Sequence, residues 1–137
     1  MYELALILVG LLAGSLLTEG MVLVPFWRNL PMAKFYELHG SGGPKLFRYF
    51  APLTTFVVLA ALGHAVTHGD SGAWIAASLC FMTLASFFVF FRAVNNKLSA
   101  HAYNQADLSE VLGKWAIWHH ARTFLMLAAS AILSFAP

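Results

Sequence analysis

Four long runs of apolar residues constrain this chain more than any other feature of its sequence. They lie at about residues 4–26, 50–67, 73–94 and 115–136. As a helix, the first run extends about 34 Å, which exceeds the roughly 30 Å thickness of a bilayer core. We therefore predict an all-α fold, in which residues 1–137 form a single domain, an integral membrane antiparallel bundle of four transmembrane helices.

The composition excludes the other broad classes of protein. Hydrophobic residues make up 60% of the 137 residues and charged residues only 10%, against roughly 25% charged residues in soluble domains. Such a chain cannot cover a globule with polar side chains, and it is too apolar for a disordered protein. Cys80 is the only cysteine, which excludes a disulfide scaffold. The net charge of +2 and the scattered basic residues do not suggest a nucleic-acid partner.

The connections between the runs give further predictions. Only Gly69–Gly72 separates the second and third runs, so those two helices are expected to be antiparallel neighbours. In the first connection, Pro31–His39 followed by Gly40 predicts a short interfacial helix, with Pro near its start and Gly at its end. Asp107 with Glu110 resembles a capping box and is expected to begin the fourth helix.

The basic residues predict how the chain lies in the membrane. Seven of the eight Lys and Arg residues flank the two long connections, whereas the hairpin and both ends of the chain carry none. By the positive-inside rule, residues 28–48 and 95–114 are cytoplasmic and both termini are outside. The seven are Arg28, Lys34, Lys45, Arg48, Arg92, Lys97 and Lys114.

Polar residues from all four predicted helices fall at a similar depth, in the cytoplasmic half of the bundle. An ionised side chain at mid-bilayer costs roughly 2.5–3.5 kcal/mol, so Glu19 and Arg122 are expected to face each other. Glu19 has two interpretations: a structural ion pair with Arg122 or Arg48, or a carboxylate that orients His119 or relays protons. The polar layer comprises Glu19, Thr54, Thr55, Asn95, Asn96, His119 and Arg122.

The fourth run carries the sharpest pattern. Trp115, Trp118, His119 and Arg122 stand at i, i+3, i+4 and i+7, so they share one helix face. That face suits a flat aromatic ligand: indole rings stack on it, the guanidinium stabilises negative charge, and the imidazole moves a proton near neutral pH. The alternative is structural, with an interfacial tryptophan belt and an arginine that snorkels or pairs with Glu19.

Two further pairs have a structural and a functional interpretation. Asn95 and Asn96 either cap the third helix or contact a ligand. His64 and His68 stand at i and i+4 near the outer end of the second run, a spacing that can hold a metal. No third ligand is obvious there, and a wet interfacial position also accounts for the two histidines. We predict no cofactor, and a metal or haem at this pair stays open.

Two segments together resemble the anthrone oxygenase-like family of small four-helix membrane proteins. Phe91–Leu98 reads FRAVNNKL, and Trp115–Thr123 has the pattern WxxWHxxRT. The first run with Pro25 and the following Leu30-Pro31 segment are also similar to that family. The resemblance covers nearly the whole chain, and the Asn-Asn and Trp-His-Arg groups are its specific part.

The resemblance implies oxygenation, without a cofactor, of a flat aromatic or quinol-like substrate in a cavity of the cytoplasmic half. An anthrone has an acidic CH₂ group, whose enolate can pass an electron to O₂. The expected roles are His119 as the base, Arg122 with Asn95 or Asn96 as stabilisers of the enolate oxygen, Trp115 and Trp118 as walls, Thr54 and Thr55 as further substrate contacts, and Glu19 as the group that sets the His119 tautomer.

Two other classes of function remain open from the residues. The chain could be a non-catalytic accessory subunit whose Phe-rich and small-residue faces dock helices of a larger membrane complex. It could also be a small transporter or proton path built on Glu19, His119 and Arg122. The expected partners are the lipid bilayer, a hydrophobic aromatic small molecule, and a larger membrane complex or a second copy of the chain.

Overall fold

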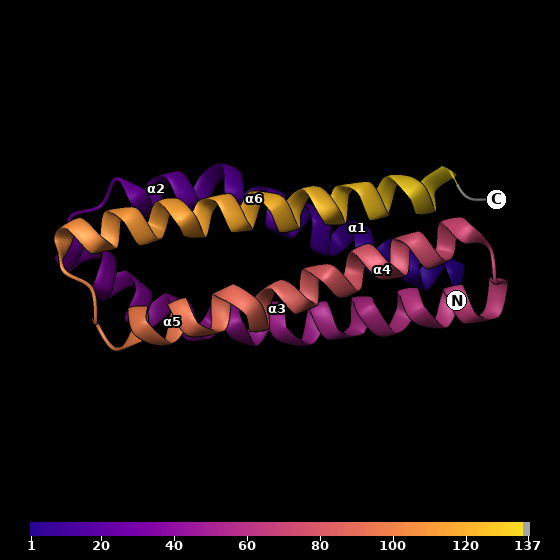
Figure 1. Cartoon of the computed structure of the whole chain (residues 1–137), viewed down its shortest axis with the longest axis horizontal. Helices are drawn as coiled ribbons and strands as arrows, with labels where there is room; N and C mark the ends of the chain where they lie inside the picture. The colour runs from indigo at the N-terminus through magenta and orange to yellow at the C-terminus, as the bar shows by residue number, and fades with distance from the viewer. Residues whose placement is uncertain (136–137) are drawn as a thin grey trace.

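A computed structural model describes residues 1–135, and these residues form helices and no strands. The all-α prediction is therefore confirmed. The helical elements join into four long segments, residues 2–28, 32–68, 71–99 and 105–135, which lie side by side along the molecule (Figure 1). Their elements are α1 (Tyr2–Thr18), η1 (Glu19–Leu23), α2 (Val24–Arg28), α3 (Met32–His68), α4 (Ser71–Ser86), η2 (Phe87–Phe91), α5 (Arg92–Ser99) and α6 (Gln105–Phe135).

The first and third segments are continuous helices that each contain one π-helical turn. In η1 the amide of Val24 donates to the carbonyl of Glu19, and in η2 the amide of Arg92 donates to the carbonyl of Phe87. Each turn therefore accommodates one extra residue, which changes the direction in which the following side chains point. Both turns lie at the level of the polar layer.

The predicted interfacial helix that ends at Gly40 is wrong. Pro31 does precede the first helical residue, but α3 then runs without interruption through Gly40 and Pro44 to His68. Glycine in a helix costs only about 1 kcal/mol relative to alanine, and packing of the helix start offsets that cost. Phe35 and Tyr36 are buried there in a cluster formed with Leu98, Leu108 and Leu112.

The turn between α3 and α4 agrees with the predicted hairpin. Gly69 ends α3 in the left-handed conformation, with φ of 74°, which glycine adopts without steric cost. Asp70 begins α4 as its N-cap, because its carboxylate accepts a hydrogen bond of 2.9 Å from the Ala73 amide. The two helices pack against each other and run in opposite directions (Figure 1).

The predicted start of the fourth helix is wrong by one turn. Asn104, not Asp107, is the cap: its Oδ1 accepts from the Asp107 amide at 3.0 Å, and its Nδ2 donates to Asp107 Oδ2 at 2.8 Å. Asn104 and Asp107 thus form the two halves of the capping arrangement. Glu110 takes no part in the cap and instead forms an exposed ion pair with Lys114. The helix begins at Gln105, directly after the cap residue Asn104.

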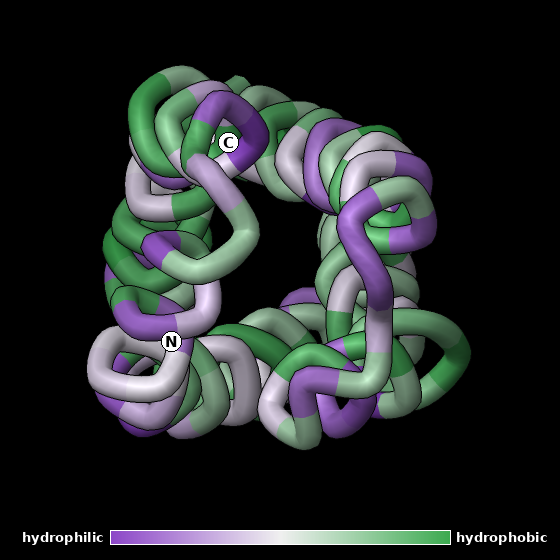
Figure 2. The backbone as a smooth tube through the Cα atoms, turned by 90° about the vertical axis from the view of Figure 1, so that its left-hand side faces the viewer, coloured by the Kyte–Doolittle hydropathy of each residue, from purple (hydrophilic) through white to green (hydrophobic). Residues whose placement is uncertain are grey.

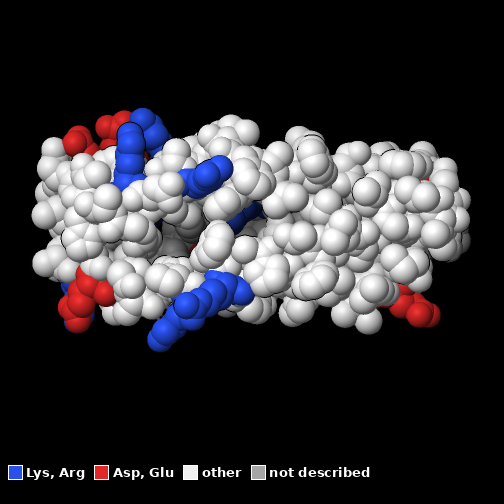
Figure 3. All heavy atoms as spheres, turned by 90° about the horizontal axis from the view of Figure 1, so that it is seen from below, with Lys and Arg blue, Asp and Glu red and all other residues white. Residues whose placement is uncertain are grey.

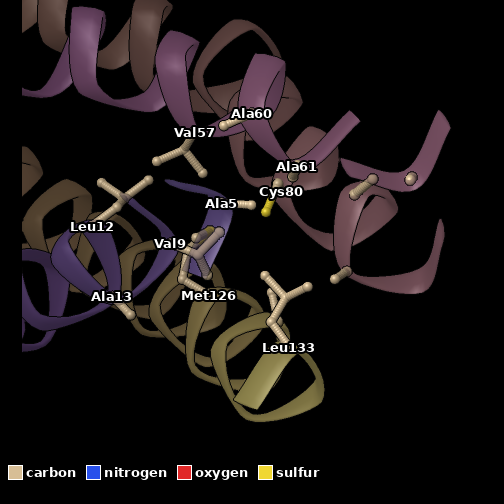
Figure 4. Packing of buried hydrophobic residues seen from close by; sticks show 14 of the residues in the cluster. Ala5, Val9, Leu12, Ala13, Val57, Ala60, Ala61, Cys80, Met126 and Leu133 are labelled. Carbon is tan, nitrogen blue, oxygen red and sulfur yellow. The ribbon is translucent and has the colours of Figure 1, made fainter. Parts of the chain in front are cut away.

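The segments pack around a common axis (Figure 2), with α1 against α3 and α6, and α4 against the same two helices. Towards the end where α3 meets α4, the core consists mainly of alanine and medium-sized side chains, which point toward one another in Figure 4. Small side chains let helices approach closely, as is typical of membrane proteins. The core residues there include Ala5, Val9, Leu12, Val57, Cys80, Met126 and Leu133.

The surface of the molecule supports an integral membrane protein. Three helices are long and apolar enough to cross a membrane, Tyr2–Arg28, Met32–His68 and Ser71–Ser99, and each buries only 28–39% of its most apolar window inside the molecule. Large apolar side chains such as Phe124 are exposed. Lys and Arg side chains gather toward one end of the face in Figure 3, and the other end of that face shows none.

The fourth predicted span, 115–136, stays a prediction, as does the orientation of the termini. Helix α6 is long enough, but His119, His120 and Arg122 lower its hydropathy, and it is not among the three helices above. The predicted last residue of this span, 136, lies outside the described residues. The side chains that make α6 less apolar form the centre described below.

Replacing Gly40 with alanine tests the continuity of α3. A Cβ atom at Gly40 meets no atom within 4 Å, so Gly40→Ala should raise the free energy of unfolding by about 0.5–1 kcal/mol. Gly69→Ala, at positive φ, should lower it by about 1–2 kcal/mol. Unfolding in mixed micelles, followed by circular dichroism, measures both. A loss of stability in Gly40→Ala would indicate that the helix ends there after all.

Candidate functional site

The guanidinium of Arg122 is the centre of the candidate site. Its Nη2 lies 2.9 Å from Nδ1 of His119 and 3.4 Å from Oε2 of Glu19. Only 13% of the Arg122 side chain and 5% of the Glu19 side chain are exposed. The predicted meeting of Glu19 with Arg122 is thus present, although the two residues are 103 positions apart in the sequence.

The hydrogen bonds of His119 identify its tautomer. Nε2 lies 2.8 Å from the carbonyl oxygen of Leu16, which can only accept, so Nε2 carries the proton. Nδ1 therefore has a free lone pair and accepts from the Arg122 guanidinium. Glu19 Oε2 lies 3.6 Å from Nδ1, and so it does not make the contact that the predicted tautomer-setting role requires. Both nitrogens of this fully buried imidazole are occupied.

Aromatic rings enclose the guanidinium. The Cζ atom of Arg122 lies 4.2 Å from the ring centre of Phe91 and 5.7 Å from that of Trp115. Trp115 in turn stacks on His119, with centroids 5.1 Å apart and planes at 9°. Cation–π contacts of this kind stabilise a desolvated guanidinium by about 2 kcal/mol. The site therefore combines a fixed positive charge with flat apolar walls.

Each of the two π-helical turns supplies one partner of Arg122. Glu19 is the first residue of η1 and Phe91 is the last residue of η2. Because a π-helical turn inserts an extra residue, it re-aims nearby side chains at some cost in helix stability, and such turns are frequent at functional sites. Here both turns occur where a side chain must reach the centre of the bundle.

The other predicted site residues divide between the centre and the surface. Trp115 is at the centre, and its indole N–H donates to Asn95 Oδ1 at 3.1 Å. Trp118 is 37% exposed and stacks on Phe90 instead of facing Arg122. Asn96 and Thr55 are exposed, and Thr54 is half-buried. The structure therefore gathers Glu19, Trp115, Asn95, His119 and Arg122, but not Trp118, Asn96, Thr54 or Thr55.

The centre also contains residues that sequence analysis did not select. Phe91 and Phe50 both face the guanidinium, at 4.2 and 6.0 Å, and Leu16 contributes a backbone oxygen. The two phenylalanines could not be distinguished from the other phenylalanines in the sequence, because an apolar run does not indicate which ring faces the interior. A backbone acceptor has no sequence signature.

A cavity lies beside the aromatic cluster of this centre, because Val24 belongs to both. It has a volume of about 370 Å³ and is lined by Val24, Pro25, Arg28, Asn29, Ser109, Leu112 and His120, so none of the predicted site residues lines it. Gly20 packs against both histidines: an added Cβ atom would lie 3.2 Å from Nε2 of His119, in the centre, and 3.3 Å from His120, which lines the cavity. A hollow is also visible on the face in Figure 3, with Lys or Arg atoms inside it.

The predicted histidine pair lies elsewhere, near the end of α3. His64 is 1% exposed and its ring centroid is 4.2 Å from that of His68, which is exposed. Among residues 1–135 there is no group of three or more His, Cys, Asp or Glu side chains that could hold a metal ion. Any metal at this pair would thus have two protein ligands from these residue types.

The fold and the site together define a small helical protein of the membrane type, with an arginine held among a carboxylate, an imidazole and aromatic rings. Comparison with protein families identifies it further: the model of the anthrone oxygenase family matches residues 41–132, and the chain belongs to that family. The match includes His119 and Arg122 but not Glu19. Neither the search of curated proteins nor the search of solved structures found a match.

Removing one member of the buried ion pair should destabilise the fold strongly. Arg122→Gln leaves the Glu19 carboxylate without its cation, and the loss of one partner of a buried pair typically costs about 3–5 kcal/mol. The double variant Glu19→Gln/Arg122→Gln should lose much less than the sum of the two single variants. A double-mutant cycle of unfolding free energies measures the coupling. Additive losses would show that the two groups do not interact.

Proposed function

We propose that this protein oxygenates a flat aromatic substrate with an acidic CH₂ group beside a carbonyl, as in an anthrone, and that Arg122 binds the substrate oxygen. One observation carries the proposal. The Nε atom of Arg122 is buried and has no hydrogen-bond partner among residues 1–135. A buried donor without a partner costs about 1–3 kcal/mol, and an enolate oxygen would satisfy it. Family membership supports the same chemistry.

The reaction needs no group beyond this chain, the substrate and O₂. A base removes one proton from the CH₂ group, and the negative charge spreads onto the substrate oxygen beside Arg122. The carbanion transfers an electron to O₂, and recombination of the radical pair forms a C–O bond. The resulting peroxide takes up a proton, then loses the second C–H proton and hydroxide, which together make water. The CH₂ group becomes C=O, and one O₂ is consumed per turnover.

Glu19 is the better candidate for the base. Its carboxylate contacts the guanidinium through Oε2 at 3.4 Å, so a proton acceptor stands beside the group that would hold the developing negative charge. His119 has no free nitrogen, because the Leu16 carbonyl and Arg122 occupy both. We therefore assign His119 as a positioning residue that holds Arg122 in place, which revises the role expected from the sequence.

The expected walls of the substrate site change as well. Trp115 and Phe91 flank the guanidinium, and Asn95 is held by the Trp115 indole. Trp118 faces Phe90, and we assign it no contact with substrate. The flat rings suit a planar polycyclic substrate, which would stack on one wall while its oxygen meets Arg122.

Oxygen uptake with an anthrone tests these roles. Glu19→Gln should reduce kcat by about 10²–10⁴-fold, the usual contribution of a general base. The wild-type rate should fall at low pH as Glu19 becomes protonated, and this limb of the pH profile should be absent from the residual activity of Glu19→Gln. His119→Gln should instead impair substrate binding and kcat together while keeping the low-pH limb, because it affects the placement of Arg122.

His101→Gln is the control for His119→Gln, since His101 is exposed in the connection between α5 and α6 and its ring stacks on Tyr36, outside the Arg122 centre. Its activity should equal that of the wild type. Quinone formation should match O₂ consumption one to one. Full activity in Glu19→Gln would remove Glu19 as the base, and full activity in Arg122→Gln, provided that the variant folds, would remove the proposal as a whole.

A further inference from the structure

A second buried polar group is unexplained by the Arg122 centre. Neither Nδ1 nor Nε2 of His64 has a hydrogen-bond partner among the described residues, although the side chain is only 1% exposed. Buried polar atoms in folded proteins are nearly always hydrogen-bonded. Burying an imidazole with two unsatisfied nitrogens costs free energy, whereas an apolar side chain at the same position would not carry this cost. The position therefore points to a ligand.

The neighbouring side chains do not supply partners for His64. The ring of Tyr2 is close, with centroids 5.4 Å apart, but its hydroxyl donates to the carbonyl of Leu133 at 2.9 Å. His68, one helical turn further along α3, is the nearest imidazole. Residues at i and i+4 share a helix face, so both rings can approach one atom between them.

The Thr67 hydroxyl leaves one nitrogen of His68 free to bind a metal. Its single proton goes to a backbone carbonyl, because its Oγ1 lies 2.9 Å from the oxygen of Gly63 and 3.0 Å from that of His64. Towards His68 Nδ1, at 3.3 Å, the hydroxyl can then only accept. Nδ1 of His68 therefore carries the proton and Nε2 a lone pair, which is how second-shell hydrogen bonds prepare a histidine for a metal.

We propose that His64 and His68 bind a divalent first-row transition-metal ion, with Cu²⁺ bound more tightly than Zn²⁺. Imidazole nitrogen suits both ions, and Cu²⁺ ranks above Zn²⁺ in affinity. With metal–nitrogen bonds of about 2.0–2.1 Å, the two ring centroids would stand roughly 5 Å apart. The present 4.2 Å requires only a small rotation, which the exposed His68 can make. Water completes the coordination shell.

This site shares no residue with the Arg122 centre and does not depend on the proposed oxygenation. It lies at the end of the molecule where α1 begins and α3 ends (Figure 1). His64 is held in the interior and His68 reaches the surface. An ion can thus enter from outside and find one ligand already fixed, which reduces the conformational entropy lost on binding.

Binding of Cu²⁺ to the full chain in detergent, after dialysis against a chelator, tests the site. Calorimetry should give one ion per chain above the background of the His64→Asn/His68→Asn variant. Electron paramagnetic resonance of the bound Cu²⁺ should show coupling to two imidazole nitrogens. His64→Asn and His68→Asn should each weaken binding by at least tenfold, whereas His120→Asn, an exposed histidine on α6, should bind as the wild type does.

His64→Leu separates binding from folding. Without metal its unfolding temperature should equal or exceed that of the wild type, because the substitution removes two unsatisfied nitrogens. Zn²⁺ should raise the unfolding temperature of the wild type, since a ligand that binds only the folded state stabilises it, and should leave His64→Leu unchanged. Wild-type binding no tighter than that of the double variant, or an equal Zn²⁺ effect in both proteins, would overturn the proposal.

Discussion

The burial of the Arg122 guanidinium is the constraint on which this molecule depends. A permanent cation in an apolar interior is tolerated only if other groups offset the loss of hydration. Glu19, His119 and Phe91 do so through an ion pair, a hydrogen bond and a cation–π contact. These partners come from α6 itself and from the π-helical turns of the first and third segments. The cation therefore determines which faces of three helical segments meet.

The rest of the bundle is built differently at its two ends. Near the α3–α4 turn, alanines such as Ala61 and Ala76 are fully buried, and the helices pack closely. Toward the other end, bulky side chains such as Phe35 and Trp115 occupy the interior in separate clusters. The cavity beside α2 and the Arg122 centre both lie in this aromatic half.

Periodicity and charge predicted the features that depend on composition: the helical class, the α3–α4 turn and the pairing of Glu19 with Arg122. The errors arose where a local signal for a helix end was outweighed by packing or by a better cap residue nearby. Gly40 resembled a helix stop, but burial of Phe35 and Tyr36 favours continuation. Asp107 resembled a cap, but Asn104 lies one turn earlier and offers both an acceptor and a donor. The spacing on α6 predicted that Trp118 shares the buried face with His119, but Trp118 stacks on Phe90. Helix periodicity does not indicate how wide the buried face is.

The Arg122 centre could not be predicted as a sequence motif, because its residues are close in space but far apart in the sequence. The family match contains Arg122 and His119, yet the proton position on His119 is set by a backbone carbonyl of α1, which any residue at position 16 would offer. Glu19 meets the cation across 103 positions of sequence, at the start of a π-helical turn that has no sequence signature. The site thus exists only once α1 has docked against α6. The same docking that buries the core also gives the guanidinium its counter-charge, so folding of the bundle and assembly of the site are one event.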